Sequence, residues 1–121
     1  MAGKLEKVVQ ARIRSLLDAR GIQHEKMWGN AINANFPDLF CGKFWIEVKA
    51  PGEKLRQGQM EWCERFDAQG VKVYVVDDER KLWDVIGYEK PGTAPNNWRA
   101  FCPRTDQRVR MKSALEGWAT P

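Results

Sequence analysis

The sequence predicts an α/β or α+β fold, a single domain in which a mixed sheet is flanked by helices. The first observation behind this is the order of patterns along the chain: a helical periodicity, short strand patterns, a helix, a strand and a further helix. The second is the run at 71–76, which is rich in apolar and β-branched residues, as in a central strand covered on both faces. The third is the length of 121 residues, which suits one domain with a core of its own.

The first half of the chain is expected to form one helix and the start of the sheet. Apolar residues fall at helical spacing over 4–20, and Gly21 ends that run. The elements expected next are an edge strand at 22–28, an asparagine-rich loop at 29–36, and strands at about 38–41 and 43–50 joined by a tight turn at Cys41-Gly42.

The second half is expected to alternate helix and strand. The predicted elements are a helix at 55–69 ended by Gly70, the strand at 71–76, a short helix at 79–88, and a last helical pattern at about 107–118. Prolines and a glycine between 91 and 95 interrupt the pattern. We therefore expect residues 1–90 to form the core, and 91–121 to be a basic extension of the same domain.

Composition excludes several classes of protein. A hydrophobic content of 43% and a charged content of 30% do not fit a disordered or collagen-like chain. The sequence contains no apolar run near the roughly 18 residues of a membrane span and no signal peptide, so a soluble, cytoplasmic protein without membrane contact is expected. Three dispersed cysteines and a single histidine argue against a disulfide framework, a zinc ribbon and a His-cluster metal site. A bound metal would need oxygen ligands, which suit Mg²⁺ or Mn²⁺, and no organic cofactor is expected.

Positive charge is concentrated near the C-terminus. Residues 1–95 carry 15 Lys and Arg against 14 Asp and Glu, a net +1, whereas 96–121 carry 5 against 2, a net +3. A basic extension on a nearly neutral body indicates a polyanionic partner such as DNA. The candidate contacts to a phosphate backbone are Arg104, Arg108 and Arg110, with Lys54 and Asn33 as further candidates, although asparagine-rich loops are also ordinary turn chemistry.

The segment around 43–49 carries the clearest chemical signal. Strand alternation places Glu47 and Lys49 on one face, with Cα atoms roughly 7 Å apart. The preceding hairpin strand begins at Pro37-Asp38, so pairing brings Asp38 beside Glu47. Two carboxylates and a lysine at one place suit metal-assisted phosphodiester hydrolysis, in which the carboxylates hold a divalent cation and the lysine stabilises charge. The alternative interpretation is a simple surface Glu–Lys pair.

Two polar residues interrupt apolar helix faces. Glu6 lies on the apolar face of the first helix, and Gln59 on that of the helix at 55–69. A polar group on a core-facing position is costly unless it has a partner. For Glu6 the alternative is first-turn stabilisation by the helix dipole, and for Gln59 a capping amide near the helix start.

The set Glu6, Asp38, Glu47-Val48-Lys49 and Gln59 resembles the PD-(D/E)XK nuclease superfamily and, within it, the virus-type replication-repair nuclease (VRR-NUC) domain. The stretch Glu47-Val48-Lys49-Ala50-Pro51-Gly52, with Leu55, Gln59, Trp62, Gly70 and Val73-Tyr74-Val75-Val76, is similar to that family over roughly residues 4–80. The resemblance implies a restriction-endonuclease-like αβββαβ core, a Mg²⁺- or Mn²⁺-dependent deoxyribonuclease and a homodimer.

The resemblance also implies roles for single residues. Asp38 and Glu47 would hold the metal together with the carbonyl of Val48, and Glu6 would complete the acidic set. Lys49 would be the catalytic lysine, and Gln59 would orient its neighbours. Stand-alone members look like Holliday-junction resolvases.

Other functions and other residues stay open at this point. One alternative is a DNA-binding or assembly module that has the fold without activity; another is a nuclease for flaps or ends. Among the tryptophans, Trp45 shares the face of Glu47, and Trp98 and Trp118 are candidates for base stacking or dimer contacts. His24 is interpreted as a surface or edge residue.

Overall fold

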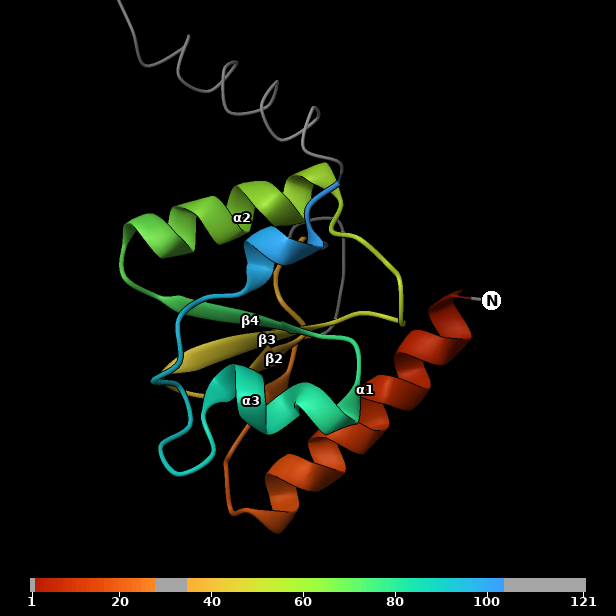
Figure 1. Cartoon of the computed structure of the whole chain (residues 1–121), viewed down its shortest axis with the longest axis vertical. Helices are drawn as coiled ribbons and strands as arrows, with labels where there is room; N and C mark the ends of the chain where they lie inside the picture. Colours follow the sequence, from red (N-terminus) through yellow and green to blue (C-terminus); the bar gives the residue numbers. More distant parts are fainter. Residues whose placement is uncertain (1, 28–34, 104–121) are drawn as a thin grey trace, which may run out of the picture.

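The computed structural model describes residues 2–27 and 35–103, and within them it is a mixed α/β fold with three α-helices and a four-stranded sheet (Figure 1). The elements are, in order, α1 (Ala2–Ala19), β1 (Glu25–Lys26), β2 (Leu39–Phe40), β3 (Phe44–Val48), α2 (Gln57–Ala68), β4 (Lys72–Val76), the 3-10 helix η1 (Glu79–Lys81), α3 (Leu82–Ile86) and the 3-10 helix η2 (Trp98–Phe101). The predicted fold class is thus confirmed at the level of a mixed sheet flanked by helices.

The sheet has the spatial order β1-β2-β3-β4. The pairs β1/β2 and β2/β3 are antiparallel, while β3 and β4 are parallel and are connected through α2. Leu39 pairs with Ile46, and Ile46 pairs in turn with Tyr74. This register places Asp38, directly before β2, opposite the end of β3.

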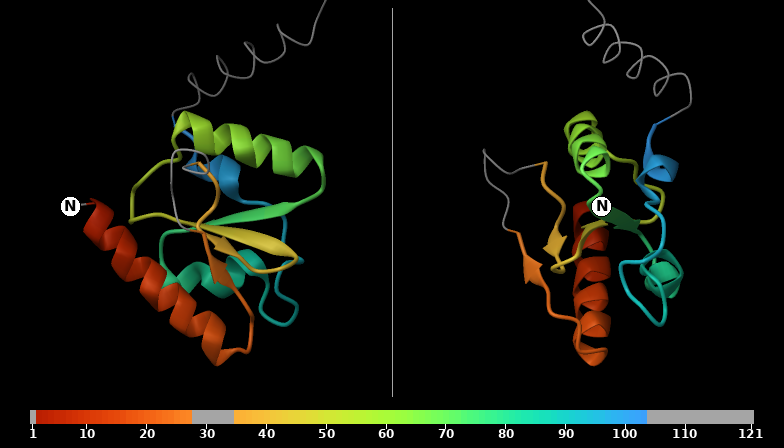
Figure 2. Two further views of the ribbon diagram at one scale, coloured as in Figure 1. Left: turned by 180° about the vertical axis from the view of Figure 1, so that it is seen from behind. Right: turned by 90° about the vertical axis from the view of Figure 1, so that its left-hand side faces the viewer.

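Helices cover both faces of the sheet, with α1 and α3 on one side and α2 with η2 on the other (Figures 1 and 2). Side chains of β3 and β4 alternate between the two layers: Ile46 and Tyr74 join the cluster under α1 and α3, and Val73 and Val75 the cluster under α2. The expected alternation is confirmed, because Phe44, Ile46 and Val48 all belong to the first cluster. Glu47 and Lys49 accordingly lie on the side of α2.

The free edge of β4 is covered by a segment that precedes η2. The side chain of Asn97 accepts a hydrogen bond from the backbone N–H of Val75 (2.7 Å) and donates one to its carbonyl (2.9 Å). Asn96 accepts one from the N–H of Val73 (2.9 Å). These amides satisfy edge groups that would otherwise be available for strand pairing.

Trp98 corrects one expectation from the sequence. Its side chain is 2% exposed, packs in the cluster under α2, and directs its indole N–H towards Asp67 at 3.3 Å. A ring buried in this way does not stack on bases or contact a partner. Trp118 lies outside the described residues.

The element bounds differ modestly from those expected. The helix patterns at 4–20 and 55–69 form α1 and α2, and the strand at 71–76 forms β4. The pattern at 79–88 divides into η1 and a short α3, which ends at Gly87 with a φ of 98°. Only Glu25–Lys26 of the stretch 22–28 forms a strand within the described residues, and the helical pattern at 107–118 falls outside them. Among the helices described, none is both long and apolar enough to cross a membrane.

Candidate metal and active site

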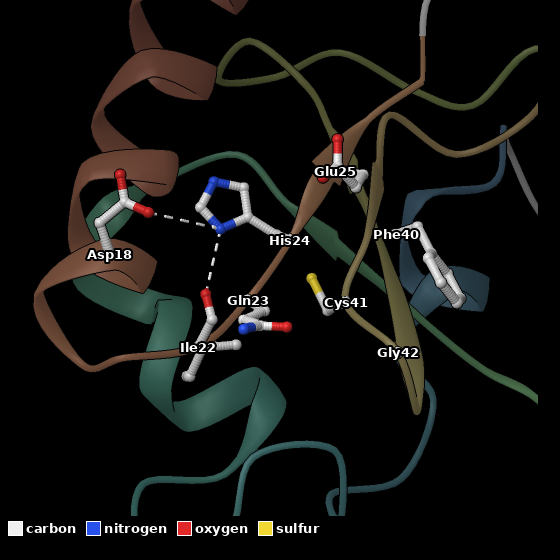
Figure 3. Close-up of a pocket in the computed structure, with 8 residues that line it drawn as sticks. All are labelled: Asp18, Ile22, Gln23, His24, Glu25, Phe40, Cys41 and Gly42. Atoms are coloured by element: carbon white, nitrogen blue, oxygen red, sulfur yellow. Dashed lines mark hydrogen bonds and ion pairs between the residues drawn. The ribbon is translucent and has the colours of Figure 1, made fainter.

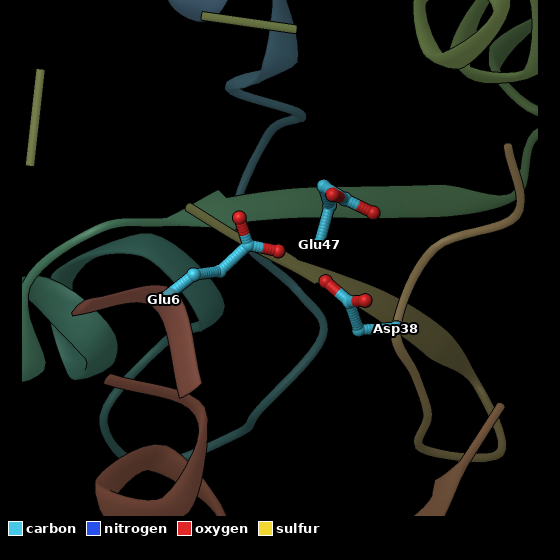
Figure 4. A group of neighbouring side chains, drawn as sticks. All are labelled: Glu6, Asp38 and Glu47. Atoms are coloured by element: carbon cyan, nitrogen blue, oxygen red, sulfur yellow. The ribbon is translucent and has the colours of Figure 1, made fainter. Parts of the chain in front are cut away.

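Three acidic side chains from distant parts of the chain meet at the C-terminal end of β3 (Figure 4). They are Glu6 of α1, Asp38 before β2 and Glu47 of β3, here called the carboxylate cluster. One carboxylate oxygen of each lies within 4.8 Å of the other two. The set that the sequence predicts as an acidic site is therefore assembled by the fold.

Asp38 is held in place by the hairpin. Its carboxylate accepts a hydrogen bond from the backbone N–H of Val48 at 2.7 Å, and its own carbonyl accepts one from the N–H of Met27 at 2.7 Å. The side chain of Val48 itself is fully buried in the cluster under α1 and α3. Asp38 is thus held by its backbone to the residue after β1 and by its side chain to the end of β3.

Glu47, Lys49 and Gln59 form a buried polar group beside the cluster. The ammonium Nζ of Lys49 lies 3.7 Å from Oε2 of Glu47, and the two side chains are 1% and 3% exposed. The amide of Gln59 donates to the same Oε2 at 2.9 Å. A Glu–Lys pair at this burial is not the simple surface pair of the alternative interpretation.

The amide of Gln59 has its orientation fixed from its other end. Its Oε1 accepts a hydrogen bond from the backbone N–H of Arg56 at 2.9 Å, at the start of α2. Its NH₂ group must then point to Glu47, because an amide presents acceptor and donor on opposite sides. Gln59 thus caps the helix and also donates to the carboxylate of Glu47, and its role in a site stays a prediction.

Glu6 owes its position to α1 packing across the end of the sheet. The helix begins at Ala2, and its first turn contains no acidic residue, so first-turn dipole stabilisation does not explain Glu6. The side chain is half-buried and shares a hydrogen bond with Glu53. Its partners are other acids, as expected of a group in a metal or active site rather than of a structural ion pair.

Glu53 is a site residue that the sequence reasoning missed. It follows the Pro51-Gly52 turn, and its Oε1 accepts a hydrogen bond from the N–H of Ala50 at 2.7 Å. Its contact with Glu6 then brings a fourth carboxyl group to the edge of the cluster. The available signal was an acid directly after the Pro51-Gly52 turn that follows β3, where the chain folds back beside the carboxylate cluster.

Burial raises the pKa values of the three acids, and neighbouring acids add to the effect for Glu6 and Glu47. Burial is the first cause for each member of the carboxylate cluster, and it raises the pKa of Glu6 to about 7, with Glu53 adding to the effect. Burial raises the pKa of Asp38, opposed by the hydrogen bond from Val48 and by Lys49. The pKa of Glu47 lies well above its usual range through burial and then through Asp38, again opposed by Lys49. Lys49, Lys26 and Arg56 oppose these shifts only in part, and a bound cation would lower the pKa values further.

The cluster fits a hard divalent cation. Mg²⁺ and Mn²⁺ take oxygen ligands, and octahedral Mg²⁺ at about 2.1 Å holds adjacent oxygens roughly 3 Å and opposite ones roughly 4.2 Å apart. The oxygens of the three acids, within 4.8 Å of one another, come close to that spacing. All donors are carboxylates, and burial is the largest cause of their raised pKa values. Carboxylates are the kind of ligand that Mg²⁺ or Mn²⁺ takes, and the bound metal stays a prediction.

Of the residues predicted to contact DNA, one lies in the part of the chain that the structure describes and four lie outside it. Lys54 is exposed next to Glu53, on the loop between β3 and α2. The candidates Asn33, Arg104, Arg108 and Arg110 lie outside the described residues, so their role as DNA contacts stays a prediction.

A pocket of about 610 Å³ lies at the other end of α1 (Figure 3). It is lined by Asp18, Ile22, Gln23, His24, Glu25, Phe40, Cys41 and Gly42. The His24 side chain is 4% exposed, with Nδ1 lying 3.1 Å from the carbonyl of Ile22, so it is an edge residue but not a surface one. Burial raises the pKa of the Cys41 thiol to about 12, which keeps it protonated and a poor nucleophile. Glu6 and Asp18 are about 18 Å apart along α1, so this pocket is separate from the carboxylate cluster.

The chain was compared with protein-family models, curated proteins and solved structures, and no match was found in any of the three.

Proposed function

We propose that this protein is a metal-dependent endodeoxyribonuclease that hydrolyses DNA phosphodiester bonds. The observation that carries the proposal is the meeting of Glu6, Asp38 and Glu47 within 4.8 Å, with the buried ammonium of Lys49 3.7 Å from Glu47. Acids that hold a divalent cation beside a lysine are what phosphodiester hydrolysis requires.

Each residue of the site has its own role in the proposed reaction. Glu6, Asp38 and Glu47 would hold Mg²⁺ or Mn²⁺, with the carbonyl of Val48 as a further ligand. The cation, when bound, would polarise the phosphoryl group as a Lewis acid and make a water molecule more acidic. Lys49 donates a hydrogen bond to the attacking water or to the phosphoryl oxygen on which negative charge grows.

Two residues hold this arrangement in place. Gln59 keeps Glu47 oriented by its hydrogen bond of 2.9 Å, and the carboxyl of Glu53 limits the movement of Glu6. Catalysis depends on such preorganisation, since a misplacement of about 1 Å can cost a factor of roughly 100 in rate.

The order of elements supports a restriction-endonuclease-like core. The run α1-β1-β2-β3-α2-β4 is the αβββαβ order that the VRR-NUC resemblance implies, with the acids at β2 and β3. From the same resemblance we propose a homodimer that acts on branched DNA, as a Holliday-junction resolvase does, with the basic extension contributing affinity. Two symmetric sites in a two-fold dimer would make the paired cuts that a four-way junction needs.

A cleavage assay tests the proposal. The substrates are a four-way junction, a flap and a linear duplex, each with Mg²⁺, Mn²⁺ or chelator. Asp38→Asn and Glu47→Gln are each expected to lower the rate by about 10³ or more, because each removes a metal-holding charge. Glu64→Gln, an exposed acid on α2, is the matched control and should retain activity.

The outcomes separate the alternatives. Rates within tenfold of wild type for both site variants would refute the assignment. Metal-dependent cleavage of flaps but not of junctions would make the protein a nuclease for flaps or ends instead. DNA binding without cleavage under any metal would favour the inactive binding module.

A further inference from the structure

Five aromatic side chains form a continuous surface on the α2 side of the sheet. They are Phe36, Phe40, Trp45, Trp62 and Phe66, here called the aromatic cluster. Ring centroids lie 4.4 Å apart for Phe36 and Trp62, and 4.9 Å apart for Phe40 and Trp45. None of the five is fully buried, and Phe40 is 39% exposed.

The aromatic cluster has an inner and an outer layer. Trp45 and Phe66, stacked with an interplanar angle of 15°, pack against the apolar cluster under α2. Phe36 contacts Trp45 and Trp62, Trp62 contacts Phe66, and Phe40 contacts Trp45 across the β2/β3 pair. These rings extend the core into a partly exposed aromatic surface.

This surface adjoins the carboxylate cluster. Trp45 precedes Glu47 by two residues in β3 and lies on the same face; Phe36 precedes Asp38 by two residues. In the extended chain of β3, two residues span roughly 7 Å. Aromatic faces and metal-holding acids therefore lie side by side.

Three cationic side chains lie on α2 or on the segment that leads to it. The guanidinium of Arg65 lies over the Trp62 ring, 4.9 Å from its centroid, and is exposed. Exposed Lys54 and Arg56 lie on the segment that joins the site to α2. Flat rings next to cations are the combination that binds the bases and phosphates of a single strand.

We infer that the aromatic cluster stacks an unpaired base of the DNA strand whose phosphodiester lies at the carboxylate cluster. The inference rests on the proposed function and adds the substrate class to it: DNA with unpaired nucleotides next to the cut. Paired bases inside a duplex have no free face to offer these rings, whereas bases at a junction, flap or frayed end do. Selection of branched DNA then comes from the site of a single protomer.

Measuring DNA binding by the protein in the presence of chelator, which prevents cleavage, tests the inference. Fluorescence anisotropy compares a labelled single-stranded DNA with the blunt duplex of the same sequence. Phe40→Leu and Trp62→Leu keep apolar bulk but lose the aromatic face, and each should weaken single-strand binding at least fivefold while duplex binding changes less than twofold. Tyr88→Leu is the control, because Tyr88 is 63% exposed and follows α3 on the opposite side of the sheet.

A second arm needs no protein variant. Wild-type protein is titrated with single strands in which one base at a time is replaced by an abasic sugar. At least one position should lose fivefold or more in affinity, because stacking depends on a base and not on phosphates. Uniform affinity across all positions would overturn the inference.

Further outcomes of these binding experiments would also decide whether the aromatic cluster stacks an unpaired base of DNA. Equal losses on single strand and duplex would mean that the rings serve general binding, and tighter binding of the matching RNA would overturn the assignment to DNA. A shift of the monomer–dimer equilibrium in the two variants, with DNA binding unchanged, would make the surface a contact between copies. If wild type never cleaves but binds single strands through these rings, the proposed nuclease function fails and the aromatic site stands.

Discussion

Raising the pH from about 5 to about 8 in the presence of chelator should lower the thermal stability of the protein. The reason is that the acids of the carboxylate cluster must then ionise, although their burial disfavours the charged form. Glu6 is the member with a defined value: burial, and then its contact with Glu53, raise its pKa from 4.5 to about 7. Between these two values the folded protein binds more protons than the unfolded chain. The free energy of unfolding therefore falls as the pH rises through this range.

The size of the effect follows from that pKa. One pKa unit corresponds to about 1.4 kcal/mol, so the full shift would correspond to roughly 3 kcal/mol. Glu6 is only half-buried, and solvent screening reduces the expected loss to about 1–2 kcal/mol. For a domain of this size, that loss lowers the melting temperature by about 4–8 °C.

Thermal melting in chelator across this pH range measures the effect. Glu6→Gln keeps the side-chain size but cannot ionise, so the difference between its curve and that of wild type isolates Glu6 from other titrating groups. Added Mg²⁺ should restore the stability of wild type near pH 8 and do so less for the variant, since the cation replaces the missing positive charge. Parallel pH curves for the two proteins, or no response of wild type to Mg²⁺, would refute the reasoning.

Three further substitutions, with Gly52→Ala as the control for the third, probe the site and the packing of the core. Lys49→Met removes the buried ammonium beside the carboxylate cluster; it should abolish turnover while calorimetry still detects Mg²⁺ binding, and unchanged turnover would contradict a catalytic role. Gln59→Ala leaves a buried carboxylate without its amide donor and should cost about 1–3 kcal/mol by chemical denaturation, with a loss of activity; an effect on stability alone would make it only a helix cap. Gly92→Ala should cost about 2–4 kcal/mol, because φ is 90° and a Cβ would lie 2.7 Å from the ring of Phe44. Gly52→Ala, with a φ of 84° and open space around it, should cost less, and equal losses would show that the ring contact adds nothing.

The local order of the fold could be predicted from the sequence. The helical periodicity before Gly21 and the β-branched run at 71–76 depend on neighbours a few residues away, and both formed the expected elements. The alternation at 43–49 likewise assigned Glu47 and Lys49 to one face, because successive side chains of a strand must point to opposite sides. The same rule placed Asp38 beside Glu47 once the hairpin was assumed.

Contacts between segments that lie far apart in the sequence could not be predicted. The sequence makes Trp98 a candidate for base stacking or dimer contacts in a basic extension, but residues near it fold back along β4, where Asn96 and Asn97 bind the strand edge. His24 is buried because a neighbouring strand and α1 close around it.

For the candidate site, the sequence by itself determined the chemistry: which acids, lysine and amide are present, and on which face of which element each lies. The tertiary structure alone decided their assembly. The packing of α1 across the end of the sheet brings Glu6 to Asp38 and Glu47, and the chain beyond β3 adds Glu53. The physical reason is that periodicity fixes the direction of a side chain relative to its own element, whereas the distance between two elements is set by the packing of the apolar layers between them.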